Sequence, residues 1–296
     1  NKSNIMVAVI SNAQSSQDNS SFGTLYVVAT PIGNLGDVSD RMRHILAQVN
    51  RIAAEDTRRT KQLLSHIGVD TPCFSMHDYN ERQKIDWVVQ LLENGESIAL
   101  VSDAGTPLIS DPGYPLVSAL REKQMRVVAV PGPCALITAL SIAGLPSDRF
   151  VFEGFLPAKS AGRIARFKAV LDETATIIIY ESSHRIMACL ADIREAYGET
   201  RQVVIARELT KTFETVISGN ASEILAVLEA DHHQTKGEFV VMIAGAAKKK
   251  DELSSEVKLL AEKLSEYLPK KQAAKISAEI HNEKKNAIYQ HLLTLE

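Results

Sequence analysis

Acidic and hydroxyl side chains set between glycine and proline residues recur directly after apolar, strand-like runs in this sequence of 296 residues. The longest such stretch, "SDAGTPLISDPG" at 102–113, follows the apolar run at 97–101 and contains Asp103 and Asp111. Gly105 allows the backbone to approach a ligand closely, and the prolines limit the entropy that the loop loses on binding. These properties favour a ligand-binding loop over a simple connection.

Five further stretches share this composition: "TPIGNLGD" (30–37), "AEDTRRT" (54–60), "VPGPCA" (130–135), "YESSHR" (180–185) and "ARELTK" (206–211). Glycine, proline and aspartate are the common turn residues, so any one stretch alone is equally well an ordinary tight turn. Ligands of open α/β sheets bind outside the carboxyl ends of the strands. Six such stretches together therefore favour a binding site.

The segments between these stretches alternate between strand-like and helix-like patterns, which predicts an α/β fold. The first half is expected to form a mostly parallel sheet, and consecutive strands at 203–207 and 213–217 predict a mixed sheet in the second half. The Pro-Gly-Pro step at 131–133 is a natural boundary. We predict a loose tail or cloning remnant at 1–21, an N-terminal α/β domain at 22–131, a C-terminal α/β domain at 132–246 and a unit of three helices at 248–296. Gly68 is expected to end a helix, and Leu268-Pro269 and His281-Asn282 are expected to separate the three C-terminal helices.

Composition argues against several classes of protein. The formal net charge of −3 gives no general attraction to nucleic acid, although a local basic patch is compatible with it. The three cysteines lie far apart, so neither a disulfide framework nor a metal site is expected, and a reducing, cytoplasmic location fits. The sequence has no Gly-x-Gly, which argues against the Rossmann dinucleotide fold. No run is long and apolar enough to suggest a membrane span.

Taken in order, the six stretches closely resemble the tetrapyrrole-methylase superfamily of S-adenosylmethionine-dependent methyltransferases, and the resemblance extends over residues 24–246. "SDAGTPLISDPGYPLV" and "GLPSDRFVFEGFLPAKS" are most similar to the bacterial branch that methylates the ribose 2′-OH of a cytidine in the decoding region of 16S rRNA. The resemblance implies two α/β domains of the tetrapyrrole-methylase type with a cofactor cleft between them. It also implies a homodimer, S-adenosyl-L-methionine as cofactor and 16S rRNA, within the 30S subunit, as substrate.

The resemblance also assigns the cofactor-binding residues. These are Asp103, Gly105, Thr106, Ile109, Ser110, Pro131, Cys134, Ala135, Tyr180, Leu209, Thr210, Gly237 and Glu238. Cys134 is expected to be a small packing residue rather than a nucleophile, because a lone cysteine beside prolines is more often part of a core.

Methyl transfer to a ribose hydroxyl benefits from a general base, whose contribution is typically about 10²–10⁴-fold. Glu55, Asp56, Glu181 and Lys211 are the candidates, and an inter-loop salt bridge is an equally good interpretation of each. The candidate RNA-binding residues are Arg58, Arg59, Lys159, Arg163, His184, Arg185, Lys270 and Lys271. The alternative for these is a solvated helix face.

Two other functions remain open at this stage. A methyltransferase of the same fold acting on a tetrapyrrole or another small acceptor would have no need of the lysine-rich C-terminal unit. A non-catalytic RNA-binding or assembly protein would have no need of the dense set of cofactor loops.

Overall fold

The computed structural model describes residues 22–247 and 253–295, so the expectation of a tail at 1–21 falls outside the described residues. The chain divides into two compact units, Asn1–Ala246 and Ala247–Glu296. Both predicted α/β domains lie in the first unit and the predicted helical unit corresponds to the second. The two units are described separately below.

The N-terminal part of the first unit contains a five-stranded sheet in the order β3-β2-β4-β1-β5, in which every pairing is parallel, as predicted. Its strands are β1 (Leu25–Val28), β2 (Arg51–Ala54), β3 (Cys73–Ser75), β4 (Ile98–Val101) and β5 (Val127–Val130). The short strand β3 is absent from the sequence-based prediction, because three residues after a proline carry no usable periodicity.

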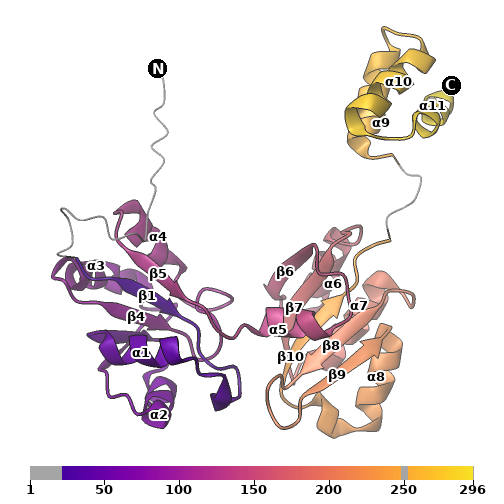
Figure 1. Ribbon diagram of the computed structural model, residues 1–296. Coiled ribbons are helices and arrows are strands. Elements are labelled where there is room, and N and C mark those ends of the chain that lie inside the picture. Colours follow the sequence, from indigo (N-terminus) through magenta and orange to yellow (C-terminus); the bar gives the residue numbers. More distant parts are fainter. Residues whose placement is uncertain (1–21, 248–252, 296) are drawn as a thin grey trace, which may run out of the picture. The chain divides into compact units, whose positions relative to one another are not determined.

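Helices cover both faces of this sheet (Figure 1). α1 (Asp40–Gln48) and α2 (Thr57–Ile67) pack on one face, and α3 (Glu81–Glu93) and α4 (Tyr114–Glu122) pack on the other. A short 3-10 helix, η1 (Leu35–Asp37), precedes α1. Local chemistry sets the helix ends as the sequence indicates: Ser39 accepts a hydrogen bond from the Met42 N–H, and Gly68 ends α2 in the left-handed conformation at φ 70°.

The second sheet is mixed, as predicted, with the order β6-β7-β10-β8-β9. β6 pairs with β7 in parallel, and the remaining neighbours are antiparallel. Its strands are β6 (Phe150–Phe155), β7 (Thr176–Ser182), β8 (Val203–Arg207), β9 (Thr215–Gly219) and β10 (Glu238–Ile243). α6 (Ser160–Ala169), α7 (Ile186–Tyr197) and α8 (Ala221–Ala230) cover one face, and α5 (Ala135–Ile142) packs on the other (Figure 1).

The position of β10 determines which loops meet. This last strand lies between β7 and β8 and runs antiparallel to both, so its first residues lie beside their last ones. Glu238 is opposite Ser182, and Phe239 is opposite Arg207. The short helix η2 (His232–Thr235) leads into this corner. The end of β7, the end of β8 and the start of β10 therefore share one edge of the sheet.

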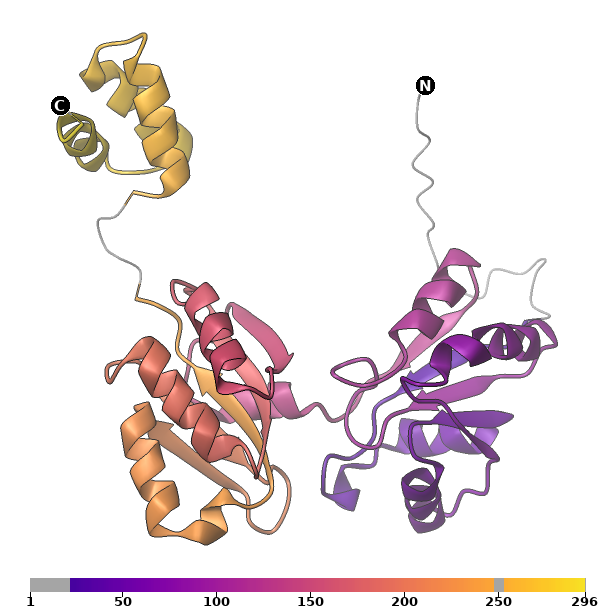
Figure 2. The same cartoon turned by 180° about the vertical axis from the view of Figure 1, so that it is seen from behind.

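The second unit consists of three helices over its described residues, in agreement with the sequence (Figure 2). They are α9 (Ser255–Ser265), α10 (Lys270–His281) and α11 (Lys285–Leu293). Pro269 precedes α10, and Asn282 ends it in the left-handed conformation, so both predicted breaks are confirmed. Val257, Ala273 and Ile288 belong to a separate core. Among the described residues, none of the helices has the length and apolar character needed to span a membrane.

Candidate active site

The loops after β2 and β4 of the first sheet hold each other by backbone hydrogen bonds. The Asp56 N–H donates to Oδ1 of Asp103 at 3.0 Å, and the Asp103 N–H donates to Oε2 of Glu55 at 3.2 Å. Gly105, at φ 82°, exchanges two backbone hydrogen bonds with Thr30, which follows β1. The carboxyl ends of three neighbouring strands are thereby fixed relative to one another.

The second sheet contributes the edge at which β7 and β8 end and β10 begins. Tyr180 and Glu181 lie near the end of β7, Leu209 and Lys211 follow β8, and Glu238 begins β10. Within this half, the Leu136 N–H of α5 donates to the Tyr180 hydroxyl at 3.1 Å. The Thr106 hydroxyl of the first half donates to the carbonyl of Pro133, in the segment that leads into α5, at 3.0 Å.

Together these two edges line a cavity of about 320 Å³, a volume within the range of small-molecule sites. The first half contributes Ile32, Glu55, Arg59, Asp103, Ala104, Gly105, Thr106, Ile109, Ser110 and Asp111. The second half contributes Cys134, Ala135, Phe155, Tyr180, Glu181, Ser182, Leu209, Lys211, Glu238, Phe239 and Val240.

The first half of the cavity is acidic. Burial raises the pKa of Glu55, while the hydrogen bond from the Asp103 backbone opposes that effect. Burial, together with the nearby charge of Glu55, raises the pKa of Asp111 to about 7, although a hydrogen bond with Ser102 opposes the rise. Desolvated carboxylates of this kind favour a cationic ligand, and one that titrates near neutrality is suited to proton transfer.

Two of the proposed general bases have structural partners that make them poor proton acceptors. Asp56 caps α2, and its hydrogen bonds with the Arg58 side chain and backbone lower the pKa of Asp56 to about 2. Burial works to lower the pKa of Lys211, but hydrogen bonds to Glu208 and Glu238 outweigh it and raise that pKa. Lys211 is therefore protonated at neutral pH, and Asp56 does not line the cavity.

Glu181 lies in the cavity wall with its side chain fully buried. One oxygen, Oε1, pairs with Nε of Arg185 at 3.1 Å, and the other, Oε2, is buried without a hydrogen-bond partner among the described residues. Tyr180, beside it, packs its ring against Phe152 and Phe155 at centroid distances of 4.9 and 5.6 Å. Burial raises the pKa of the Tyr180 phenol, so this side chain stays a neutral hydrogen-bonding group.

Comparison with known proteins defines the family. A family model described as tetrapyrrole (corrin/porphyrin) methylases matches residues 24–225, and a model of the RsmI C-terminal HTH domain matches residues 251–296. The chain belongs to the tetrapyrrole methylase family. The resemblance seen in the sequence is thus confirmed.

Named relatives are similar along nearly their whole length. "Ribosomal RNA small subunit methyltransferase I" of Escherichia coli O157:H7 is 51% identical, over 94% of this chain and 97% of that protein. The protein of the same name from Pseudomonas aeruginosa is 50% identical, over 92% of this chain and 98% of that protein.

Solved structures confirm the fold. Uroporphyrin-III-C-methyltransferase from Thermus thermophilus has a TM-score of 0.53 at 16% identity, over 75% of this chain and 94% of that one. The methyltransferase CobJ has a TM-score of 0.57 at 17% identity, over 76% of this chain and 95% of that one.

Most of the residues that the resemblance to this family assigns to the cofactor lie in the cavity wall. The exceptions are Pro131, Thr210 and Gly237, which flank it in sequence. The structure fits a cationic nucleoside cofactor in two respects. Gly105 lines the cavity at φ 82°, a conformation that favours glycine, and Glu181 Oε2 offers a buried acceptor that has no hydrogen-bond partner in the part of the chain that the structure describes.

The candidate RNA-binding residues are dispersed. Arg58 is exposed at the start of α2, Arg59 lines the cavity with Nη1 3.4 Å from Oδ2 of Asp103, and Lys159 and His184 are exposed. Arg185 donates to the carbonyl of Leu156 at 2.7 Å. In the second unit, Lys270 begins α10 and Lys271 beside it is exposed.

The assignment of Arg163 to RNA binding is wrong. Its guanidinium is buried, with a side-chain exposure of 3%, and pairs with Asp192 at 2.6 Å while donating to the carbonyl of Ala158 at 2.7 Å. The basic side chains at 157–168 are typical of an exposed helix face, but α6 turns Arg163 toward α7. Local sequence does not indicate this pairing, because Asp192 lies 29 residues further along the chain.

Asp111 is the main site residue that sequence reasoning did not assign. It stands at the end of the quoted loop, where Asp-Pro-Gly reads as a turn. Leu108 at φ 73° and Ser110 at φ 64° adopt left-handed backbone conformations. Sequence reasoning could not anticipate these conformations, because neither leucine nor serine favours them. These conformations fold the loop so that Ile109, Ser110 and Asp111 all line the cavity.

Proposed function

We propose that this protein transfers a methyl group from S-adenosyl-L-methionine to the ribose 2′-OH of a cytidine in the decoding region of 16S rRNA. The observation that carries the proposal is the acidic cavity between the two sheets, in a chain about half identical to small-subunit rRNA methyltransferases over nearly its whole length. We further propose that it acts in the cytoplasm, on the 30S subunit, as a homodimer.

The cofactor, when bound, supplies an electrophilic methyl group on a positively charged sulfur atom. Asp103 and Glu55 provide negative charge in the cavity, and their reciprocal contacts through the backbone at Asp56 and Asp103 keep them in place. Tyr180 and Phe155 supply aromatic surface on the opposite wall. Holding the reactants in line is worth up to roughly 7–11 kcal/mol of the barrier.

Asp111 is the best proton acceptor for the 2′-OH among the cavity residues. It lines the cavity, and its pKa of about 7 means that the carboxylate is available at physiological pH while retaining affinity for a proton. Glu55, whose pKa burial also raises, is the second candidate. Arg58 and Arg59, both exposed at the start of α2, are suited to meet RNA phosphates beside the cavity.

The deciding experiment offers tritiated S-adenosylmethionine with 30S subunits, and separately with naked 16S rRNA, both from cells that lack the modification. We expect label in 2′-O-methylcytidine and none with Asp103→Ala. Cofactor binding without label in either RNA would overturn the rRNA proposal. Incorporation into a tetrapyrrole, with a Soret band in the purified protein, would favour the small-acceptor alternative.

A further inference from the structure

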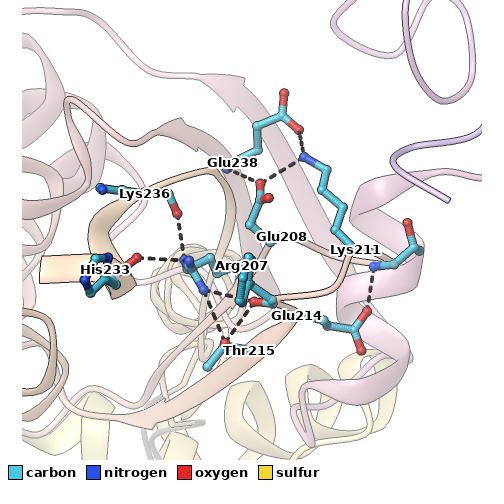
Figure 3. A network of polar contacts seen from close by, with 10 residues as sticks. Arg207, Glu208, Lys211, Glu214, Thr215, His233, Lys236 and Glu238 are labelled. Atoms are coloured by element: carbon cyan, nitrogen blue, oxygen red, sulfur yellow. Dashed lines mark hydrogen bonds and ion pairs between the residues drawn. The ribbon is translucent and has the colours of Figure 1, made fainter. Parts of the chain in front are cut away.

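Arg207, the last residue of β8, buries its guanidinium among backbone carbonyls (Figure 3). Nε donates to the carbonyl of Lys236 at 2.6 Å, Nη2 to that of His233 at 2.9 Å and Nη1 to that of Phe213 at 2.9 Å. The residue is only 6% exposed. Within the described part of the chain, no carboxylate forms an ion pair with it.

A buried guanidinium without an anionic partner is unfavourable unless its donors are satisfied. Here the acceptors are carbonyls of two segments that lie outside the sheet, a loop and the short helix η2 with the residues after it. The first segment, 208–214, joins β8 to β9, and the second, 232–237, joins α8 to β10. Arg207 therefore cross-links the two segments from the side away from the cavity, which it does not line.

The same two segments form the second sheet's part of the cavity wall. Leu209 and Lys211 come from the first segment, and Glu238 directly follows the second. They are joined again on the cavity side, where Nζ of Lys211 lies 2.9 Å from Oε1 of Glu208 and 2.9 Å from Oε2 of Glu238 (Figure 3). The Glu238 N–H also donates to Oε1 of Glu208 at 3.1 Å.

The 208–214 and 232–237 segments meet at a junction formed by Glu208, Lys211 and Glu238, and the backbone there has little freedom to relax. Glu208 and Thr210 adopt left-handed conformations, at φ 50° and 66°, which side chains of these types rarely adopt without support. Gly237 has φ 100°, and a Cβ at that position would overlap the side chain of Glu208. A change at the back of the junction must therefore shift the residues that line the cavity.

We propose that Arg207 is a positioning residue for the cofactor site. It holds the 208–214 and 232–237 segments at the separation that cofactor binding requires. The proposal rests on the proposed cofactor site but concerns a residue outside the cavity. Lysine cannot replace arginine here, because one ammonium group cannot reach three carbonyls that a planar fork reaches together.

Arg201 is a matched control at the start of the same strand region. Its guanidinium also donates to two carbonyls, of Ala244 at 2.9 Å and Leu171 at 3.0 Å, and it does not line the cavity. Arg201→Lys and Arg207→Lys therefore remove similar hydrogen bonds at different places. Both are expected to lower Tm, and only the second is expected to change the affinity for the cofactor.

The test measures the Kd for S-adenosylhomocysteine by isothermal titration calorimetry, well below the Tm of each variant. Arg207→Lys is expected to raise Kd at least tenfold, and Arg201→Lys to leave it within twofold. In methyl transfer, Arg207→Lys is expected to raise KM for S-adenosylmethionine while kcat at saturation stays within about threefold of wild type. A folded Arg207→Lys protein with the wild-type Kd overturns the proposal.

Arg207→Gln gives a second variant in case Arg207→Lys does not fold. Its neutral amide has two N–H donors and cannot satisfy all three carbonyls, so a raised Kd supports the proposal and a wild-type Kd in the folded variant contradicts it. Failure of the wild-type protein to bind S-adenosylhomocysteine would instead refute the proposed function. The two failures are thus distinguishable.

Discussion

The guanidinium of Arg163 lies 2.6 Å from Oδ2 of Asp192, and both side chains are almost completely buried, at 3% and 8% exposure. The pair joins α6 to α7, and Ser160 adds a hydrogen bond to the other carboxylate oxygen at 2.6 Å. A basic residue in a stretch that looks like an RNA-binding arm is thus part of the protein's internal architecture.

Breaking this pair is expected to destabilise the protein strongly. Arg163→Ala leaves the Asp192 carboxylate buried without its charge partner, which typically costs about 3–5 kcal/mol, and urea unfolding measures the loss. The double variant Arg163→Met/Asp192→Leu should recover most of the lost free energy of unfolding, because it leaves no buried charge unpaired. Lys159→Ala, about one turn earlier and exposed, is the control. Weakened RNA binding by a fully stable Arg163→Ala would contradict this assignment.

Lys211 is expected to act as a fixed cation and not as a base. Its hydrogen bonds to Glu208 and Glu238 outweigh burial and raise its pKa, so at neutral pH the side chain is an ammonium group that cannot accept a further proton. Lys211→Arg keeps the charge and should retain activity within about tenfold, with an unchanged pH–rate profile. A loss of 10²–10⁴-fold, the usual effect of removing a general base, would show that the prediction is wrong.

Replacing Asp111 is expected to abolish proton transfer while leaving the cofactor in place. Asp111→Asn should reduce the single-turnover methylation rate by about 10²–10⁴-fold and remove the rise in rate that we expect of wild type between pH 6 and pH 8. Calorimetric affinity for S-adenosylhomocysteine reports on cofactor binding separately. Loss of that affinity would assign Asp111 to cofactor binding, and an unchanged pH profile would leave Glu55 as the proton acceptor.

Relative to wild type, Asp111→Asn should become more stable as the pH rises. Burial raises the Asp111 pKa from 3.8 to about 7, so between these values the folded protein holds a proton that the unfolded chain has released. Wild-type stability therefore falls over this interval, by up to about 1.4 kcal/mol per pH unit before solvent screening. With screening of this partly exposed group, Asp111→Asn should gain about 1–2 kcal/mol on wild type between pH 4 and pH 8 in urea unfolding. An equal pH dependence of the two proteins would contradict the pKa shift.

The elements that the sequence predicted well are those whose signals are local. The parallel and mixed sheets, the stop of α2 at Gly68 and the breaks around α10 follow from periodicity, capping and left-handed residues. The recurrent loops were correctly expected at the ends of strands, because parallel strands bring such ends to one edge.

The features that the sequence did not predict depend on contacts between distant residues. Burial of Arg163 depends on Asp192, and the titration of Asp111 depends on how closely Glu55 approaches it from another loop. The structural role of Lys211 likewise depends on Glu238, 27 residues further along the chain. Composition identifies such residues as polar, and only the fold shows which charges meet.

The cavity draws its lining from loops of both sheets, so its ligand recognises the folded chain and not the unfolded one. By mass action, a cofactor at a hundred times its Kd adds about 2.7 kcal/mol to the free energy of unfolding. With the proposed cofactor, saturation is therefore expected to slow proteolysis that proceeds through the unfolded chain, so the same ligand that supplies the methyl group also protects the protein.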